Sequence, residues 1–377
     1  MFSTLSFQSK SAFLKKTHET TSLDTHARIK IEAENIIGDK DMKPNRWVVV
    51  VIILYLWAPA APAKNLPLMR ISVENSDTHV QTTAVKRFAD ELAQKLQGRI
   101  DVQFFSNARL YRDKDIVQAL GQGKVEMAVP GTWHIARFEP NVGIFLLPIF
   151  YGKPASANYT VLEGDVGKAI NDRIEKRLQL KVVGRWIDLG HAHLFSMQKK
   201  IARHKDIEEM VVRVAGGVAN KLRIEVFGGY PTVISWPDLP EYMRQGRVEA
   251  ILTSYETVRS AKLWEKGIRY AFEDREYFPQ YIPLVRMSFW RKCPPDVQQI
   301  LTRTWEKHVD AARADAARAQ SKAKQILIQN GVEIVVADAK EIETWRKRML
   351  ARIDDFISKM GVDAELVKRI NHALWER

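Results

Sequence analysis

Residues 230–256, YPTVISWPDLPEYMRQGRVEAILTSYE, decide the fold because they hold two strand-like runs joined by one short helix. The first run ends at Trp236, and Pro237 opens the helix, as proline does in a first helical turn. Gly246 ends the helix, and Val248 to Leu252 forms the second run. This strand–helix–strand unit predicts parallel-type strands covered by helices.

The same alternation extends outward in both directions. A helical spacing of apolar residues over 85–96 ends at Gly98, and a short helix is expected over 115–120. Further strands are expected at 69–74, 100–105, 125–129, 178–187 and 210–215. The sequence therefore predicts an α/β protein, long enough for two lobes.

A long helix is expected near the C-terminal end. Pro294 and Pro295 suit its first turn, and Asn330-Gly331 suits its end. About 35 residues at 1.5 Å per residue would extend roughly 50 Å, which is longer than one small lobe is wide. We expect a helix that bridges both lobes. A dimerising rod remains the alternative.

Residues 42–63, MKPNRWVVVVIILYLWAPAAPA, have a cationic head, an apolar centre and a small-residue end. This order is typical of a secretory signal peptide, and the apolar run is short for a membrane span. We expect cleavage after Ala63 and export to the periplasm. Residues 1–41 are interpreted as an over-long gene start, with a cytoplasmic arm before an uncleaved anchor as the alternative.

Composition excludes several classes of protein. The chain has 58 Lys and Arg against 45 Asp and Glu, a net charge of +13. The two signs are interspersed, without a basic run rich in aromatic residues, so no nucleic-acid partner is expected. The single cysteine, Cys293, leaves the exported protein without an internal disulfide. No phosphate loop or nucleophile elbow occurs, and no cofactor or metal is expected.

Arg213 is the most informative polar residue. It lies within the apolar run 210–215 (MVVRVA), and Gly216 and Gly217 follow it. A buried guanidinium is costly without a partner, and its planar fork matches a carboxylate. An internal Arg–Asp pair is the alternative. Trp236 and Thr253 both lie at carboxyl ends of strands, where open α/β sheets bind ligands.

The chain resembles the extracytoplasmic solute-binding proteins of tripartite ATP-independent periplasmic (TRAP) transporters, of the dicarboxylate-binding (DctP-like) type. The resemblance runs in family order over almost the whole mature chain. It is carried by these segments: MRISVENSDTH, GRIDVQFFSNARL, ALGQGKVEMAV, FLLPIFY, MVVRVAGG, ISWPDLPEYMRQGRVEA and FWRKCPPDVQQIL.

The resemblance implies a two-lobed periplasmic-binding-protein fold that closes on a small organic acid and delivers it to TRAP permease subunits. The carboxylate-binding arginine of the family falls on Arg213, and an aromatic residue that lines the ligand falls on Trp236. Thr253 takes the place of a polar residue, with Tyr255 just beyond it. The resemblance also implies that the cleft is lined by Glu74, Asn75, Thr132, Trp133, His134 and His193.

The chain departs from the family pattern in ways that bear on the ligand. Many members that bind acids carry a second arginine where GHAHLF gives Ala192 and His193. A monocarboxylate with an aromatic or hydroxyl portion is therefore expected, rather than a sialic or dicarboxylic acid. Residues 64–187 plus 279–318 are expected to form lobe I, and 188–278 plus 319–377 lobe II. A monomer is expected, with a dimer as the alternative.

Two other functions are alternatives for this sequence. A loaded receptor of the same fold could report to a membrane sensor instead of a permease. A metal-dependent hydrolase could use Asp188, His191 and His193, because the two histidines of a His-x-His pair face the same side of a strand. Such a pair alone is a weak signal, so the sequence favours capture of a ligand over catalysis.

Overall fold

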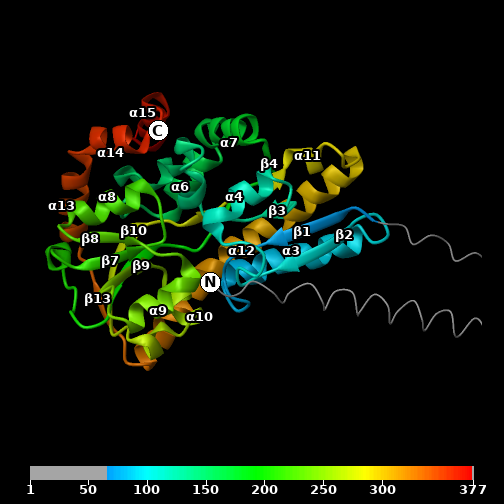
Figure 1. Cartoon of the computed structure of the whole chain (residues 1–377). Helices are drawn as coiled ribbons and strands as arrows, with labels where there is room; N and C mark the ends of the chain where they lie inside the picture. The colour runs from blue at the N-terminus through cyan, green and yellow to red at the C-terminus, as the bar shows by residue number, and fades with distance from the viewer. Residues whose placement is uncertain (1–65, 376–377) are drawn as a thin grey trace, which may run out of the picture. The chain divides into compact units, whose positions relative to one another are not determined.

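The computed structural model describes residues 66–375, without the side chains of Glu276 and Trp375 (Figure 1). The expected signal peptide and the residues before it lie outside this range. Within it, no helix combines the length and the apolar character required to cross a membrane.

The first sheet has five strands in the order β2-β1-β3-β12-β4. Its members are β1 (Leu68–Ser72), β2 (Asp101–Phe105), β3 (Met127–Ala128), β4 (Leu180–Val182) and β12 (Leu284–Arg286). β1 runs parallel to β2 and β3, whereas β12 is antiparallel to β3 and β4. The parallel part follows from helical connections, α3 (Val80–Lys95) between β1 and β2 and α4 (Asp113–Gly121) between β2 and β3.

The second sheet has six strands in the order β13-β10-β6-β9-β7-β8. Its members are β6 (Ala192–Ser196), β7 (Val211–Val214), β8 (Tyr230–Val233), β9 (Ala250–Thr253), β10 (Tyr270–Tyr277) and β13 (Glu333–Val336). β7 lies parallel to β8 on one side and to β9 on the other. The parallel unit expected from residues 230–256 is therefore present at this edge of the sheet.

The chain passes between the sheets through segments that pair with each other. β5 (Ile187–Asp188) and β11 (Gln280–Tyr281) form a small antiparallel sheet of their own. The single strand expected at 178–187 is instead divided into β4 and β5. In the stretch between β4 and β5, the N–H of Arg185 donates a 2.6 Å hydrogen bond to Oε1 of Glu306 on the long helix.

The long helix, α12 (Pro295–Gln329), has the expected length of 35 residues. It packs against α3 beside the first sheet, against β5, and against α10 (Tyr255–Ser260) beside the second sheet (Figure 1). Trp305 meets Phe88 of α3 edge to face at 5.1 Å, whereas Leu327 is buried in the core behind the second sheet. The helix therefore contributes to the cores on both sides, as a bridging helix must.

The remaining helices cover these sheets and the crossings. They are α5 (Thr132–Ile135), α6 (Ala155–Leu162), α7 (Asp165–Leu178), α8 (Val218–Val226), α9 (Leu239–Arg244), α11 (Met287–Trp290), α13 (Ala339–Leu350), α14 (Ile353–Met360) and α15 (Ala364–Trp375). Short 3-10 helices occupy Pro140–Leu146, Pro148–Phe150, His204–Ile207, Trp236–Asp238 and Leu263–Lys266. α14 packs on α8, and α15 on α6 and α7. The last helix, α15, thus packs on helices from the first half of the chain.

Candidate functional site

A small cavity of about 40 Å³ receives side chains that follow strands of both sheets. Glu74 and Asn75 come after β1, Arg213 lies in β7, and Thr253 ends β9. The other residues that line it are Asp113, Trp133, Leu189, Ala215, Trp236, Leu252, Ser254, Thr257, Tyr277, Pro279 and Tyr281. Six of the ten residues expected at the site therefore meet around one cavity.

Arg213 is 3 % exposed and has its guanidinium fixed on one side by the backbone. Its Nε and Nη2 donate to the carbonyl oxygen of Ile234 at 3.0 and 2.8 Å, and the guanidinium carbon lies 5.9 Å from the ring of Trp236. Burial lowers the pKa of Arg213 to about 10, and the charge of Glu74 opposes this shift. Within residues 66–375 Arg213 makes no ion pair at 4 Å or less. It is a buried cation, and Glu74 is the acidic group that offsets it.

Glu74 and Asp113 form a buried carboxyl pair beside this cation. The amide of Asp113 donates to Oε1 of Glu74 at 3.2 Å, and the amide of Gly131 donates to Oδ2 of Asp113 at 3.4 Å. Burial raises the pKa of Glu74. Burial and the charge of Glu74 raise the pKa of Asp113 well above its usual range. Burial and the mutual repulsion of the two carboxylates thus oppose ionisation of both groups at once.

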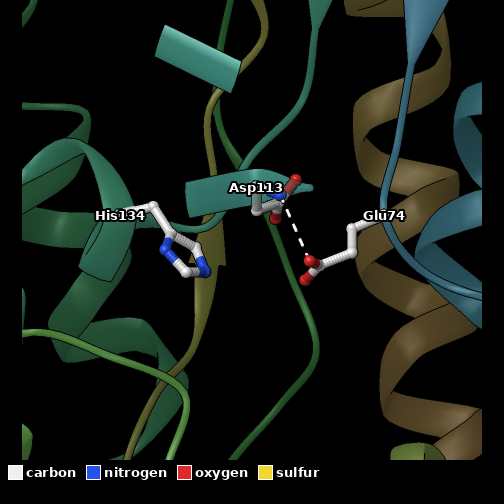
Figure 2. Close-up of side chains that lie close together, drawn as sticks. All are labelled: Glu74, Asp113 and His134. Carbon is white, nitrogen blue, oxygen red and sulfur yellow. Dashed lines mark hydrogen bonds between the residues drawn. The ribbon is translucent and has the colours of Figure 1, made fainter. Parts of the chain in front are cut away.

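His134 completes this group. Figure 2 shows the Glu74 carboxyl and the His134 imidazole reaching toward the same region beside Asp113. One potential ligand atom from each of the three side chains lies within 4.8 Å of those of the other two. Burial, with the charges of Arg213 and Arg137, lowers the pKa of His134 to about 3, so the ring is neutral. Such donors fit a divalent cation by type, but the charge of Arg213 acts on the same group and opposes a further cation.

Trp133 forms one wall of the cavity. Its ring meets Tyr281 at 5.4 Å and Tyr277 at 6.5 Å, both edge to face. In the described part of the chain its buried indole N–H has no hydrogen-bond partner, nor has the hydroxyl of Thr132. A side chain at Gly131 would place its Cβ 2.3 Å from the Trp133 ring, so glycine is required there.

A second cavity, of about 280 Å³, adjoins the first across Trp133. His134, Gly216 and Gly217 line it, and Trp133 and Ala215 line both cavities. Gly217 has a φ of +85°, and a Cβ there would lie 3.2 Å from that of Trp133. The pair of glycines after β7 thus allows the backbone to approach this indole closely.

Two expected residues, Tyr255 and His193, line a different cavity. Tyr255 donates to Glu273 at 2.9 Å, and Nδ1 of His193 accepts from the amide of Arg275 at 3.1 Å. Tyr255 follows Thr253 by only two residues, but Ser254 caps α10 between them and the chain turns. The structure therefore separates these two residues from Arg213.

The histidines of the hydrolase alternative also lie around that cavity. Asp188 accepts hydrogen bonds from the Tyr159 hydroxyl and the Gly190 amide, and His191 contacts the Lys153 carbonyl oxygen. In the range 66–375, the group with metal-ligand spacing is Glu74, Asp113 and His134, and it includes none of the alternative's three residues.

The sequence did not indicate Asp113, Tyr277 or Tyr281. Asp113 opens α4 after the carboxyl end of β2, and that position was the available signal. Tyr281 belongs to β11, one of the strands that cross between the sheets. Its hydroxyl accepts from Nδ2 of Asn75 at 3.3 Å, a contact across 206 residues that no local pattern predicts.

Two α/β sheets with crossing strands, a bridging helix and a cavity lined from both sides define a two-lobed binding protein. The profile of one family, bacterial extracellular solute-binding protein, family 7 (DctP), matches residues 71–359. The chain belongs to this family, as the resemblance in its sequence predicted.

Individual relatives agree with this assignment. A solute-binding protein of Chromohalobacter salexigens is 22% identical over 291 residues, 77% of this chain and 84% of the relative. The C4-dicarboxylate-binding periplasmic protein DctP of Rhodobacter capsulatus is 24% identical over 280 residues, 73% of this chain and 82% of the relative.

Solved structures support the fold. The sugar acid binding protein DctPAm of Advenella mimigardefordensis, in complex with galactonate, has a TM-score of 0.77 and 19% identity, covering 82% of this chain and 99% of its own. A TRAP periplasmic solute-binding protein of Desulfovibrio salexigens with bound orotic acid has a TM-score of 0.76 and 18% identity, covering 81% and 98%. The expected two-lobed periplasmic-binding-protein fold with a bridging helix is confirmed.

Proposed function

We propose that this solute-binding protein captures a small organic acid through Arg213 and delivers it to the membrane subunits of a TRAP permease. The observation that carries the proposal is the buried guanidinium of Arg213, which within residues 66–375 donates hydrogen bonds to a single carbonyl oxygen and lines a cavity between the sheets. A carboxylate would bind its remaining N–H groups with charge-assisted hydrogen bonds. Trp236 would pack against the apolar part of the ligand, and Thr253 would contribute a hydrogen bond.

Capture and release require the lobes to move. We propose lobe I at 64–187 plus 279–318, and lobe II at 188–278 plus 319–377. The strand content supports this division, because β1–β4 and β12 share one sheet whereas β6–β10 and β13 share the other. α15 packs on α6 and α7 and so extends from lobe II onto lobe I. Ligand contacts available only when both lobes meet would favour the closed form.

The same proposal sets the location. We propose that the protein acts in the periplasm as a monomer, after cleavage following Ala63, and that it binds its ligand without chemical change. The dicarboxylates, sugar acids and orotate named for its relatives all carry a carboxylate, which agrees with the role given to Arg213.

The test is calorimetry on the mature protein after a thermal-shift screen of organic acids. Replacing Arg213 by Ala removes a charged hydrogen bond in a buried site and should weaken binding by about a hundredfold or more. The exposed Arg244, which pairs with Glu241, provides the control Arg244→Ala. Unchanged affinity in Arg213→Ala would exclude Arg213 from the site.

A further inference from the structure

The cavity contains acidic side chains as well as Arg213. A ligand whose only charged group is a carboxylate would not bind to these acidic side chains. Glu74 and Asp113 are 7 % and 5 % exposed, and both line the same cavity as Arg213. Backbone amides occupy Oε1 of Glu74 and Oδ2 of Asp113. No hydrogen bond from the described residues reaches Oε2 of Glu74 or Oδ1 of Asp113. The pair therefore has acceptor oxygens left for a hydrogen-bond donor.

Arg213 is a buried cation that lines the cavity together with two buried carboxyl groups. Burial raises the pKa of both carboxyl groups, because it disfavours their charged forms. The other charges that act on Glu74 are Arg112 and Asp238, and these two pair with each other at 2.6 Å. A ligand that brings only a carboxylate would add a further negative charge beside these two buried acidic side chains, which is unfavourable.

The walls of the cavity also suit a positive charge. Trp133, Tyr277, Tyr281 and Trp236 all line it, and aromatic faces attract cations. The guanidinium of Arg213 already lies over Trp236, so Trp133 and the tyrosines are the walls beside the carboxyl pair. Aromatic rings and carboxyl oxygens together match a protonated nitrogen better than a second acid group.

We propose that the ligand is a zwitterion, an acid that also bears a protonated amino or imino nitrogen, with its carboxylate on Arg213 and its nitrogen at Glu74 and Asp113. This inference rests on the proposed function, because Arg213 must first hold the carboxylate. The nitrogen donates N–H hydrogen bonds to the two remaining carboxyl oxygens and cancels the charge that the ligand's acid group brings. A metal ion at Glu74, Asp113 and His134 is disfavoured by the charge of Arg213.

The experiment compares acids that share one carbon skeleton and differ in one group. Each skeleton is supplied in four forms. Butanoate, 4-hydroxybutanoate, 4-aminobutanoate and succinate form one series, and propanoate, lactate, alanine and methylmalonate form another with the substituent next to the acid. Thermal shift on the mature protein selects the skeletons that bind, and calorimetry ranks their four forms. Calcium and zinc salts alone are screened in parallel.

We expect an amino member to bind about tenfold or more tightly than its hydroxy counterpart, and the plain acid and the dicarboxylate to bind more weakly still. Glu74→Gln should remove most of this preference for nitrogen, whereas Arg213→Ala should weaken all members alike. Asp115→Asn, an exposed acid on the same helix as Asp113, is the control.

The outcomes separate this inference from the proposed function. A hydroxy acid or dicarboxylate that binds best, and does so through Arg213, overturns the zwitterion but leaves carboxylate capture intact. Absence of binding by every amino member also overturns it, as does a shift by calcium or zinc alone that Glu74→Gln abolishes. Binding unaffected by Arg213→Ala overturns the proposed function itself.

Discussion

The carbonyl oxygen of Ile234 holds the guanidinium of Arg213, accepting hydrogen bonds from Nε at 3.0 Å and from Nη2 at 2.8 Å. Ile234 follows β8 and lies two residues before Trp236, so the arginine is fixed to the segment that carries the aromatic wall. In the described structure Nη1 makes no hydrogen bond with protein. The arginine is therefore held in place with part of its fork directed to the cavity.

The first prediction concerns this fork. Arg213→Lys retains the charge but cannot bond the Ile234 carbonyl oxygen and a carboxylate in the same planar geometry. We expect ligand affinity to fall by roughly ten- to a hundredfold, less than for Arg213→Ala. Calorimetry on Arg213→Lys and Arg213→Ala, with Arg244→Lys as the control, measures this order of ligand affinities. Equal affinity of Arg213→Lys and the unaltered protein would show that the charge alone matters.

The second prediction concerns the stability cost of Asp113. Its folded-state pKa is raised, so the folded state disfavours the ionised carboxyl, whereas the unfolded chain ionises it above about pH 4. This group therefore lowers stability as pH rises above that value. Asn accepts the same Gly131 hydrogen bond without a charge. We expect Asp113→Asn to increase the free energy of unfolding at pH 7.

Urea unfolding at pH 7 and near pH 4 tests the sign, with Asp115→Asn as the control. The gain in Asp113→Asn should diminish toward pH 4, because the Asp113 carboxyl then becomes protonated in the unfolded chain as well. A variant that is less stable than the unaltered protein at pH 7 would show that the Asp113 charge is stabilised, contrary to the buried geometry.

The third prediction concerns His134. Its pKa of about 3 lies below that of a histidine in an unfolded chain, about 6.5. The folded protein therefore keeps a neutral ring from pH 8 to 5, while the unfolded chain takes up a proton and gains stability as pH falls through 6.5. NMR of the imidazole carbons and nitrogens should show no titration of His134 in this interval. A midpoint near 6.5 would place the ring in solvent.

The fourth prediction concerns the bridging helix. Trp305 of α12 is 2 % exposed, packs on Phe88, and donates from Nε1 to the Arg185 carbonyl oxygen at 2.9 Å. Trp305→Ala should cost about 3–5 kcal/mol of stability, whereas Trp305→Phe should cost less because it retains most of the packing. Ile328→Ala, on the exposed side of the same helix, should change stability by less than about 0.5 kcal/mol in chemical denaturation.

Local sequence patterns were sufficient to predict three features of the fold and the site. The strand–helix–strand unit at 230–256, the length of α12 and the buried position of Arg213 follow from spacing and from burial of apolar neighbours. The division of residues 178–187 did not follow, because it depends on a contact between Arg185 and Glu306 from a distant helix.

The remainder of the site depends on contacts between distant parts of the chain. Glu74 and Asp113 are 39 residues apart, and they meet because β1 and β2 are neighbours whose carboxyl ends share one edge of the sheet. Tyr281 joins them only through the crossing strand β11. Thr253 and Tyr255 are two residues apart and still belong to different cavities. Distance along the sequence predicted neither the contact between Glu74 and Asp113 nor the separation of Thr253 from Tyr255.

The last prediction concerns the joint between α3 and α12. Glu91 of α3 accepts from Lys307 at 2.9 Å and from His308 at 2.8 Å, and it also pairs with Lys95. Hydrogen bonds from Lys95, Lys307 and His308, that from Lys95 above all, lower the pKa of Glu91 to about 2. The contribution of this ion-pair cluster to stability is present above the unfolded-state pKa of about 4.3 and is lost as pH falls toward 2.

Because the cluster is near the surface, Glu91→Gln should cost only about 1 kcal/mol of stability at pH 7, and less in high salt. Asp90→Asn removes a more exposed pair with Lys86 on the same helix and should be near neutral in the same urea titration. If both variants lose the same stability, the contact to α12 contributes nothing beyond an ordinary surface pair.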